Sequence, residues 1–119
     1  SVELARHEPM LHADVRRTIR LLLLSRRCSR ADVAKRLGIH PRTLGRRLQE
    51  SGTTFQALLD DMRAQMAKQL LLDTRLPVAR IAAAVGYEDP TIFSRAFARW
   101  TGRTPSEFRA ELVARARHG

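Results

Sequence analysis

Two segments of this sequence carry side chains whose types and spacing suit contacts with nucleic acid. In the first segment Arg42, Arg46 and Gln49 recur at helical spacing, and in the second Thr91 and Arg95 do the same. A guanidinium group presents a planar fork of donors that can pair with two acceptors at once, on a phosphate or on a guanine edge. Arginines are also common on helix faces that are only solvated. Whether these arginines could bind nucleic acid therefore depends on the elements that position them.

The charge of the chain favours a polyanionic partner. The 119 residues include 22 lysines and arginines against 12 acidic residues, which gives a formal net charge of +10. Only Lys35 and Lys68 are lysines. Genomic base composition could account for the preference for arginine over lysine, but it does not account for the net charge. We therefore expect a nucleic acid as the partner.

The composition predicts an all-α fold. Hydrophobic residues make up 44% of the chain, and no stretch alternates apolar and polar residues as a half-buried strand does. The longest strongly apolar run, Leu21–Leu24, is far too short to span a membrane, so no membrane partner is expected. Cys28 is the only cysteine, which excludes an internal disulfide and fits a reducing compartment.

Helical periodicity and capping residues predict a series of helices separated by short breaks. Ser29 is a suitable N-cap, Pro41 and Pro90 suit the first helical position, and Gly38 and Gly86 suit helix ends. The expected helices cover residues 14 to about 25–28, 29–37, 41–50, 54–72, 78–85, 90 to about 100, and 105 onward.

The fourth of these helices is the longest and has one predicted apolar stripe. Its members are Phe55, Leu58, Leu59, Met62, Met66 and Leu70. Residues 1–12 lack clear periodicity, and we interpret them as the remnant of a linker or as a loosely packed arm.

The second half of the chain repeats the first. The paired positions are Val33–Gly38 with Ile81–Gly86, then Leu44, Arg46 and Leu48 with Phe93, Arg95 and Phe97, then Gly52, Thr54 and Leu58 with Gly102, Thr104 and Phe108. The offset grows from 48 to 49 and then to 50 residues, so the second copy has gained one residue in each of two connections. Each copy consists of a short helix, a tight turn and a second helix, which is the helix-turn-helix pattern. The expected divisions are residues 1–12, a first helix-turn-helix subdomain at 13–53, a linker helix at 54–73 and a second subdomain at 74–119.

The second helix of such a unit turns its outer face toward the major groove of DNA. With Leu44 and Leu48 pointing inward, helical phase gives the outward positions of the first unit. They are Arg42, Gly45, Arg46 and Gln49. The outward positions of the second unit are Thr91, Arg95 and Ala98, flanked by Ser94 and Arg99. Arg46 and Arg95 occupy equivalent positions in the repeat. This equivalence would not be expected if the two arginines were only solvated.

Side chains beside these faces suit phosphate contacts, which orient a protein on DNA without reading its sequence. The candidates are Arg47, Ser94, Arg99, Arg103 and Thr104. The amides at the helix starts near Arg30 and Val78 are further candidates through the helix dipole. The arginines interpreted as surface or bracing residues are Arg36, Arg63, Arg80 and Arg109.

Several segments match the pattern of a known family. They are Gly38–Leu44, Arg46–Leu48, Gly86–Tyr87, Phe93–Phe97 and Trp100–Arg109. In this combination the chain resembles the AraC/XylS family of bacterial transcription regulators, from about Asp14 to Leu112, and the second motif is highly specific. The resemblance implies seven helices, in which one long helix joins two helix-turn-helix subdomains. It also implies that each subdomain inserts a recognition helix into one of two successive major grooves.

The resemblance assigns base-reading positions, and it also shows where this sequence departs from the pattern of the family. The positions are Arg42, Gly45 and Arg46 in the first unit and Thr91, Ile92 and Arg95 in the second. Gly45 and Ile92 cannot donate a hydrogen bond to a base edge, although Ile92 could pack on a thymine methyl group. His40 stands where the family often has a serine cap, so we expect a slightly weaker start of that helix.

The resemblance also implies partners and a longer parent protein. Family members usually carry an effector-binding or dimerising domain, commonly N-terminal, and commonly contact RNA polymerase at the promoter. The chain begins at Ser1, and we expect it to be a fragment, the output domain of an effector-responsive regulator in the bacterial cytoplasm and nucleoid. Asp60–Asp61 and Glu107–Glu111 are alternative acidic surfaces for the polymerase.

Two other classes of function fit the sequence less well. The four histidines are His7, His12, His40 and His118. They are scattered without metal-ligand spacing, and Cys28 has no evident base partner, so neither an enzyme nor a cofactor is expected. RNA-binding modules usually use aromatic stacking platforms. Here Phe93, Phe97 and Phe108 fall at core spacing, and Trp100 is expected at the core margin. A protein-interaction role stays compatible with DNA binding.

Overall fold

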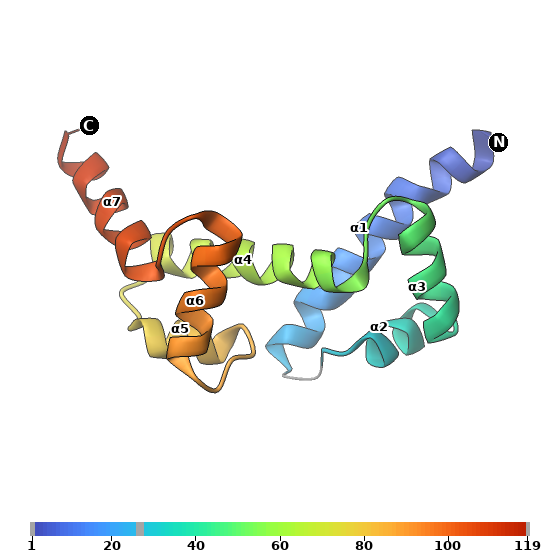
Figure 1. The fold of residues 1–119 in the computed structure, drawn as a ribbon, viewed down its shortest axis with the longest axis horizontal. Coiled ribbons are helices and arrows are strands. Elements are labelled where there is room, and N and C mark those ends of the chain that lie inside the picture. The colour runs from blue at the N-terminus through green and yellow to red at the C-terminus, as the bar shows by residue number, and fades with distance from the viewer. Residues whose placement is uncertain (1, 26–27, 119) are drawn as a thin grey trace. The chain divides into compact units, whose positions relative to one another are not determined.

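The computed structural model describes the backbone of residues 2–25 and 28–118, with side chains for 10–25 and 28–117. Within these residues the chain forms seven helices and no strand (Figure 1). The helices are α1 (Val2–Leu24), α2 (Arg30–Leu37), α3 (Pro41–Glu50), α4 (Phe55–Asp73), α5 (Val78–Ala84), α6 (Pro90–Thr101) and α7 (Pro105–His118). The predicted all-α class and the order of the helices are confirmed.

The start of α1 differs from the prediction. Periodicity indicates a helix from Asp14, whereas α1 begins at Val2. An amphipathic pattern predicts only the turns that bury a face, and once a helix has nucleated each further residue adds a backbone hydrogen bond without needing a core. Met10, on this extension, is 64% exposed. The predicted helix start is therefore wrong, and the role of residues 1–12 as a linker or arm stays a prediction.

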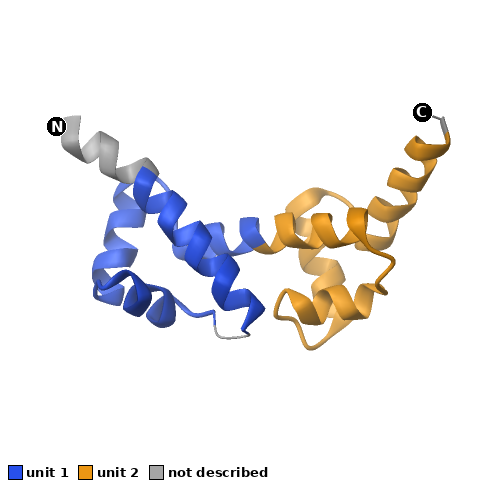
Figure 2. Cartoon of the chain, turned by 180° about the vertical axis from the view of Figure 1, so that it is seen from behind, with its two compact units in different colours: residues 1–62 blue, residues 63–119 orange. Residues whose placement is uncertain are grey.

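The chain divides into two compact units, Ser1–Met62 and Arg63–Gly119, which are called unit 1 and unit 2 below (Figure 2). The division falls inside α4. Each unit contains one helix-turn-helix pair, α2 with α3 in unit 1 and α5 with α6 in unit 2.

Unit 1 has a core of aliphatic side chains from four helices, with α1 packed against both α2 and α3. The buried apolar residues are Val15, Ile19, Leu22, Leu23, Val33, Ala34, Leu44, Leu48, Leu58, Leu59 and Met62. Two polar contacts add to this packing. His12 Nε2 lies 2.6 Å from Ser51 Oγ at the end of α3, and Arg16 forms a 3.5 Å ion pair with Asp61 of α4.

Unit 2 is organised around two phenylalanines of α6. Phe93 and Phe97 are fully buried with ring centroids 5.9 Å apart, and Phe97 meets Phe108 edge-on at 5.8 Å. The other buried members of the core are Ala67, Leu71, Ile81, Ala82 and Val85. Trp100 lies at the core margin, as expected, with its ring 6.0 Å from that of Tyr87. Aromatic pairs in these geometries add to the stabilisation that burial provides.

α4 contributes different residues to the two cores. Its buried residues are Leu58, Leu59, Met62, Ala64, Ala67 and Leu71. The predicted stripe instead continues through Met66 and Leu70, which are only partly buried and pack at the margin of the unit 2 core. The prediction of one apolar stripe along the whole helix is therefore wrong, because each half of α4 packs on its own core.

Arg109 of α7 closes the connection that follows α4. Its guanidinium donates hydrogen bonds to the backbone carbonyl oxygens of Leu71 (3.3 Å), Thr74 (3.1 Å) and Leu76 (2.6 Å). These oxygens lie at the end of α4 and just beyond it, where no further helical turn supplies donors. Of the two roles that the sequence left open for Arg109, surface or bracing residue, the structure shows bracing.

Replacing Arg109 by alanine is expected to lower the free energy of unfolding of unit 2 by about 2–3 kcal/mol, because three carbonyl groups lose a charged donor. Urea unfolding followed by the fluorescence of Trp100, the only tryptophan, measures this loss. Arg117→Ala is the control, since Arg117 is exposed near the end of the same helix. Equal unfolding midpoints for the two variants would show that the bracing contacts add no stability.

The first turn of α7 is closed by a capping box. Thr104 Oγ1 accepts a hydrogen bond from the Glu107 amide at 3.1 Å, and Glu107 Oε1 accepts one from the Thr104 amide at 3.0 Å. The hydrogen bonds from the backbone and side chain of Thr104 lower the pKa of the Glu107 carboxyl below its ordinary value of 4.5, and the charge of Arg103 lowers it further.

This capping box makes the stability of α7 depend on pH. Because the pKa of Glu107 is lower in the folded than in the unfolded state, the ionised carboxylate stabilises the fold above pH 4.5. That contribution is lost as the pH falls through the lowered pKa. We expect Glu107→Gln to be slightly less stable than the parent chain at neutral pH and equally stable in acid. Urea midpoints across the acid range test this, and a difference that stays constant with pH would contradict it.

Candidate nucleic-acid interface

The turn between α2 and α3 is a glycine-terminated helix end. Gly38 has a φ of +73°, in the left-handed region that glycine adopts without steric cost. Its amide donates to the Lys35 carbonyl at 3.2 Å, and the Ile39 amide donates to the Ala34 carbonyl at 3.0 Å. This pair of bonds is the Schellman motif, which stops α2 and turns the chain into α3.

Unit 2 repeats this turn between α5 and α6. Gly86 has a φ of +96°. The amides of Gly86 and Tyr87 donate to the carbonyls of Ala83 and Ala82 at 3.1 and 2.9 Å. The predicted repeat therefore extends to individual backbone hydrogen bonds.

Arg63 of α4 holds this second turn in place. Its Nε donates to the carbonyl oxygen of Val85 at 3.1 Å, and its guanidinium lies 5.1 Å from the centroid of the Tyr87 ring. The second contact is a cation–π interaction. Arg63, which the sequence left as a surface or bracing residue, is therefore a bracing residue.

Both second helices begin in the same way. Pro41 and Pro90 occupy the first helical turn. His40 Nδ1 accepts a hydrogen bond from the Arg42 amide at 3.1 Å, as Asp89 Oδ1 does from the Thr91 amide at 2.8 Å. The imidazole of His40 thus serves as the N-cap of α3.

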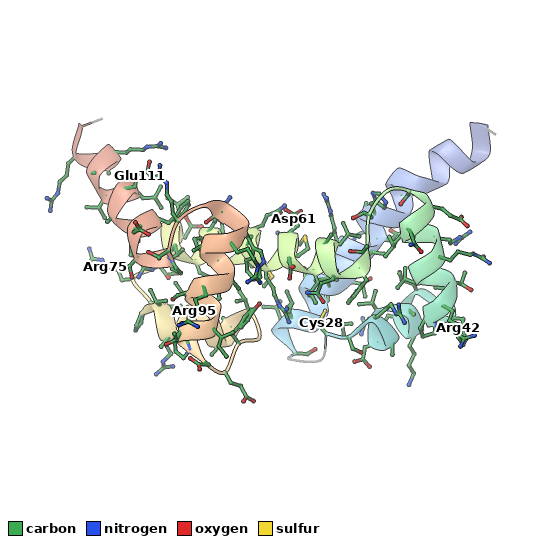
Figure 3. All side chains as sticks on the ribbon, viewed as in Figure 1. Cys28, Arg42, Asp61, Arg75, Arg95 and Glu111 are labelled. Atoms are coloured by element: carbon green, nitrogen blue, oxygen red, sulfur yellow. The ribbon has the colours of Figure 1, made fainter. Side chains whose placement is uncertain are left out.

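α3 separates a buried face from a basic one. Leu44 and Leu48 are fully buried, whereas Arg42, Arg46 and Gln49 are exposed, as helical phase predicts. Arg46 forms an exposed ion pair of 3.7 Å with Glu50, a type of contact that contributes little to stability. The Arg42 guanidinium, labelled at the start of α3 in Figure 3, has no hydrogen-bond or ion-pair partner among the residues that the structure describes.

α6 has the same division of faces. Phe93 and Phe97 are buried, while Thr91, Ile92 and Arg95 are exposed. Arg95 is labelled on α6 in Figure 3. Ile92 is 56% exposed, and it is one of several large apolar side chains that are exposed among the described residues. Within the described part of the chain, the Arg95 guanidinium has no polar partner.

The candidate phosphate contacts fall into two groups. Arg47 and Arg99 are exposed and make no polar side-chain contact with described residues, whereas Ser94 is half-buried. Arg103 is paired with Glu111 of α7, and the Thr104 hydroxyl serves the capping box. The last two side chains are therefore already engaged within unit 2.

Sequence reasoning did not assign the side chain of Arg30 to this interface, although it named the helix-start amide near Arg30 as a candidate phosphate contact. A concave surface beside α3 is lined by Arg30, Arg42, Gly45, Arg46, Gln49, Thr54 and Phe55. A Cβ atom added to Gly45 would lie 3.1 Å from Nη1 of Arg30, so the α2 guanidinium rests on the face of α3. The signal that pointed there was a glycine inside a helix, which commonly marks a close approach.

The two capped turns and the two second helices with exposed basic faces define a helix-turn-helix DNA-binding protein. A helix-turn-helix domain model matches residues 33–111. The chain belongs to the AraC-type helix-turn-helix family, as the DNA-binding domain of a transcription regulator. No helix among the described residues is long and apolar enough to cross a membrane.

Curated relatives match the chain over part of their length. It is 43% identical over 94 residues to the ornithine utilization regulator of Pseudomonas aeruginosa, covering 76% of this chain and 28% of that protein. It is 40% identical over 81 residues to the arabinose operon regulatory protein of Escherichia coli, covering 67% and 28%. The chain spans between 22% and 29% of the length of these and similar relatives.

Solved structures share the fold. A DNA-binding transcriptional dual regulator of Escherichia coli K-12 superposes with a TM-score of 0.78 at 27% identity, covering 85% of this chain and 96% of that chain. The DNA-binding domain of AdpA, a global transcriptional factor crystallised with a target DNA, superposes with a TM-score of 0.71 at 25% identity, covering 88% and 97%.

Proposed function

We propose that the chain recognises a specific DNA sequence by inserting α3 and α6 into successive major grooves of one duplex. The observation that carries this proposal is the equivalence of the two exposed helices. Both begin at a capped proline after a Schellman turn, and both carry an exposed arginine at the same place in the repeat, Arg46 and Arg95. The DNA-binding domain of AdpA was crystallised in complex with a target DNA, which supports DNA as the partner.

Base reading is assigned to the outward positions of the two helices. They are Arg42, Gly45, Arg46 and Gln49 in α3 and Thr91, Ile92 and Arg95 in α6. Arginine pairs bidentately with guanine, and glutamine does so with adenine. The exposed apolar side chain of Ile92 suits the methyl group of thymine.

Phosphate contacts are assigned to the residues beside these faces, Arg47, Ser94, Arg99, Arg103 and Thr104. Arg47 and Arg99 are the stronger candidates because neither guanidinium is paired with a described residue. Arg103 would have to share its guanidinium with Glu111. Such contacts weaken with salt, as counterions compete for the phosphates.

In the whole protein we assign this domain the role of the output half of an effector-responsive regulator. The small share of each relative that it covers is compatible with a sensor or dimerising domain, which we place N-terminal to it. The names of two relatives refer to ornithine utilization and to the arabinose operon, which supports control by a metabolite. Contact with RNA polymerase at the promoter is part of this proposal.

Selection of bound sites from randomised duplexes, repeated at two salt concentrations, tests the proposal. We expect two sequence-restricted clusters whose centres lie about ten base pairs apart, one helical turn of DNA. Inserting about five base pairs, half a turn, between the clusters should reduce binding to the level of random DNA. Unrestricted sequences at both salt concentrations would leave only counterion-driven binding and overturn the proposal.

A further inference from the structure

The guanidinium of Arg30 occupies the space that a side chain at position 45 of α3 would take. Arg30 is the first residue of α2, yet its Nη1 is 3.1 Å and its Cζ 3.9 Å from the position of a Cβ atom on Gly45. Gly45 has a helical backbone, since it is absent from the glycines with positive φ. No turn explains a glycine here, and the space it leaves is filled by the Arg30 guanidinium.

The surroundings of Arg30 favour a ligand rich in acceptors. Arg30 shares its concave surface with Arg42 and Arg46, and none of the described residues that line this surface is a carboxylate. Arg30 is exposed, and its side chain has no hydrogen-bond or ion-pair partner among the described residues. Arg46 is paired with Glu50 at 3.7 Å, but Arg30 and Arg42 beside it have no counter-charge among the described residues. Like charges placed in this way repel one another, and acceptors on a base edge or a phosphate would relieve that repulsion.

We propose that Arg30 reads a base pair across Gly45, supplying from α2 the polar side chain that the outward face of α3 lacks at that position. This inference rests on the proposed function, since it requires α3 to enter the major groove. Gly45 is then a positioning residue, which acts by leaving the guanidinium room to lie on the helix. Unit 1 would then read DNA with arginines from both helices of its helix-turn-helix pair, α2 and α3.

A double-mutant cycle tests this inference. We expect Arg30→Ala to lower affinity for the selected site by roughly ten- to a hundredfold while leaving affinity for random duplex nearly unchanged. Gly45→Ala should weaken preference at the same base pair, because the new methyl group displaces the guanidinium. In the Arg30→Ala background Gly45→Ala should have little further effect, because no guanidinium is left to displace.

Two controls keep the result interpretable. Arg36→Ala removes an exposed arginine of α2 that does not line the concave surface, and it should not change base preference. Gly45→Ala should raise the urea midpoint of the free chain, since alanine is the better helix former, so its loss of binding would not come from unfolding.

The outcomes also separate this inference from the proposed function. If Arg30→Ala loses affinity equally on the selected site and on random duplex, Arg30 is a phosphate contact. If Gly45→Ala keeps its full effect in the Arg30→Ala background, the glycine itself lets α3 approach the bases. Either result overturns the inference. If Arg46→Ala changes base preference in the same assay while Arg30→Ala does not, the inference fails and the proposed function stands. If neither changes it, recognition by α3 fails as well.

Discussion

Replacing Phe97 by alanine is expected to lower the free energy of unfolding of unit 2 by about 3–5 kcal/mol. The side chain is fully buried and packs between Phe93 and Phe108, with ring centroids 5.9 and 5.8 Å away. Its removal leaves a cavity at the point where α6 meets α7, in addition to the lost burial. A loss of this size is a large part of the stability of a small domain.

Urea unfolding followed by two probes measures this effect. Trp100 is the only tryptophan and lies at the margin of the unit 2 core, so its fluorescence reports on unit 2, whereas far-ultraviolet circular dichroism reports on all helices. Leu48→Ala, in the unit 1 core, should lower the dichroism midpoint more than the fluorescence midpoint. Ile92→Ala, on the exposed face of α6, should leave both nearly unchanged. If Ile92→Ala is as damaging as Phe97→Ala, the structural division of α6 into two faces is wrong.

Arg46→Ala and Arg95→Ala are each expected to lose about 1–3 kcal/mol of binding free energy on the selected site. Each should relax base preference at its own position, with the two positions roughly ten base pairs apart. Because they lie in different units and share no partner, their losses should add in the double variant to about 2–6 kcal/mol. Competition binding against duplexes with single base-pair changes measures both effects.

The matched control for these two variants is Arg75→Ala, which removes an exposed arginine from the connection between α4 and α5. It corrects for the general loss of one positive charge, which acts on every duplex alike. Should Arg46→Ala and Arg95→Ala lose affinity equally on selected and random duplex, they would be phosphate contacts, and sequence reading would have to come from other positions.

The starts and ends of several helices could be predicted from the sequence. Ser29 and Pro41 mark helix starts, and Gly38 and Gly86 mark helix ends, and all lie where predicted. These features depend on hydrogen bonds between residues only a few positions apart, so the residue types themselves carry the information. The internal repeat was equally legible, because the two copies share the same turn chemistry.

The corrections concern features without a local signal. The start of α1 at Val2 was missed because residues 1–12 show no clear apolar period, which is the signal that predicts a helix. In α4 a single stripe was predicted through Met66 and Leu70, whereas Ala67 and Leu71 are buried. Periodicity indicates which residues share a face of a helix. It does not indicate that the two halves of one helix pack against different cores.

The sequence by itself determined the helices, the paired turns and which side chains of α3 and α6 point outward, because helical phase and capping operate within a few residues. Only the tertiary structure decided which distant residues meet. Arg109 reaches carbonyl groups 33 to 38 residues earlier, and Arg30 lies on Gly45 in the next helix. Such contacts depend on how the cores orient whole helices, and long arginine side chains can reach many partners, so the residue type alone does not select one.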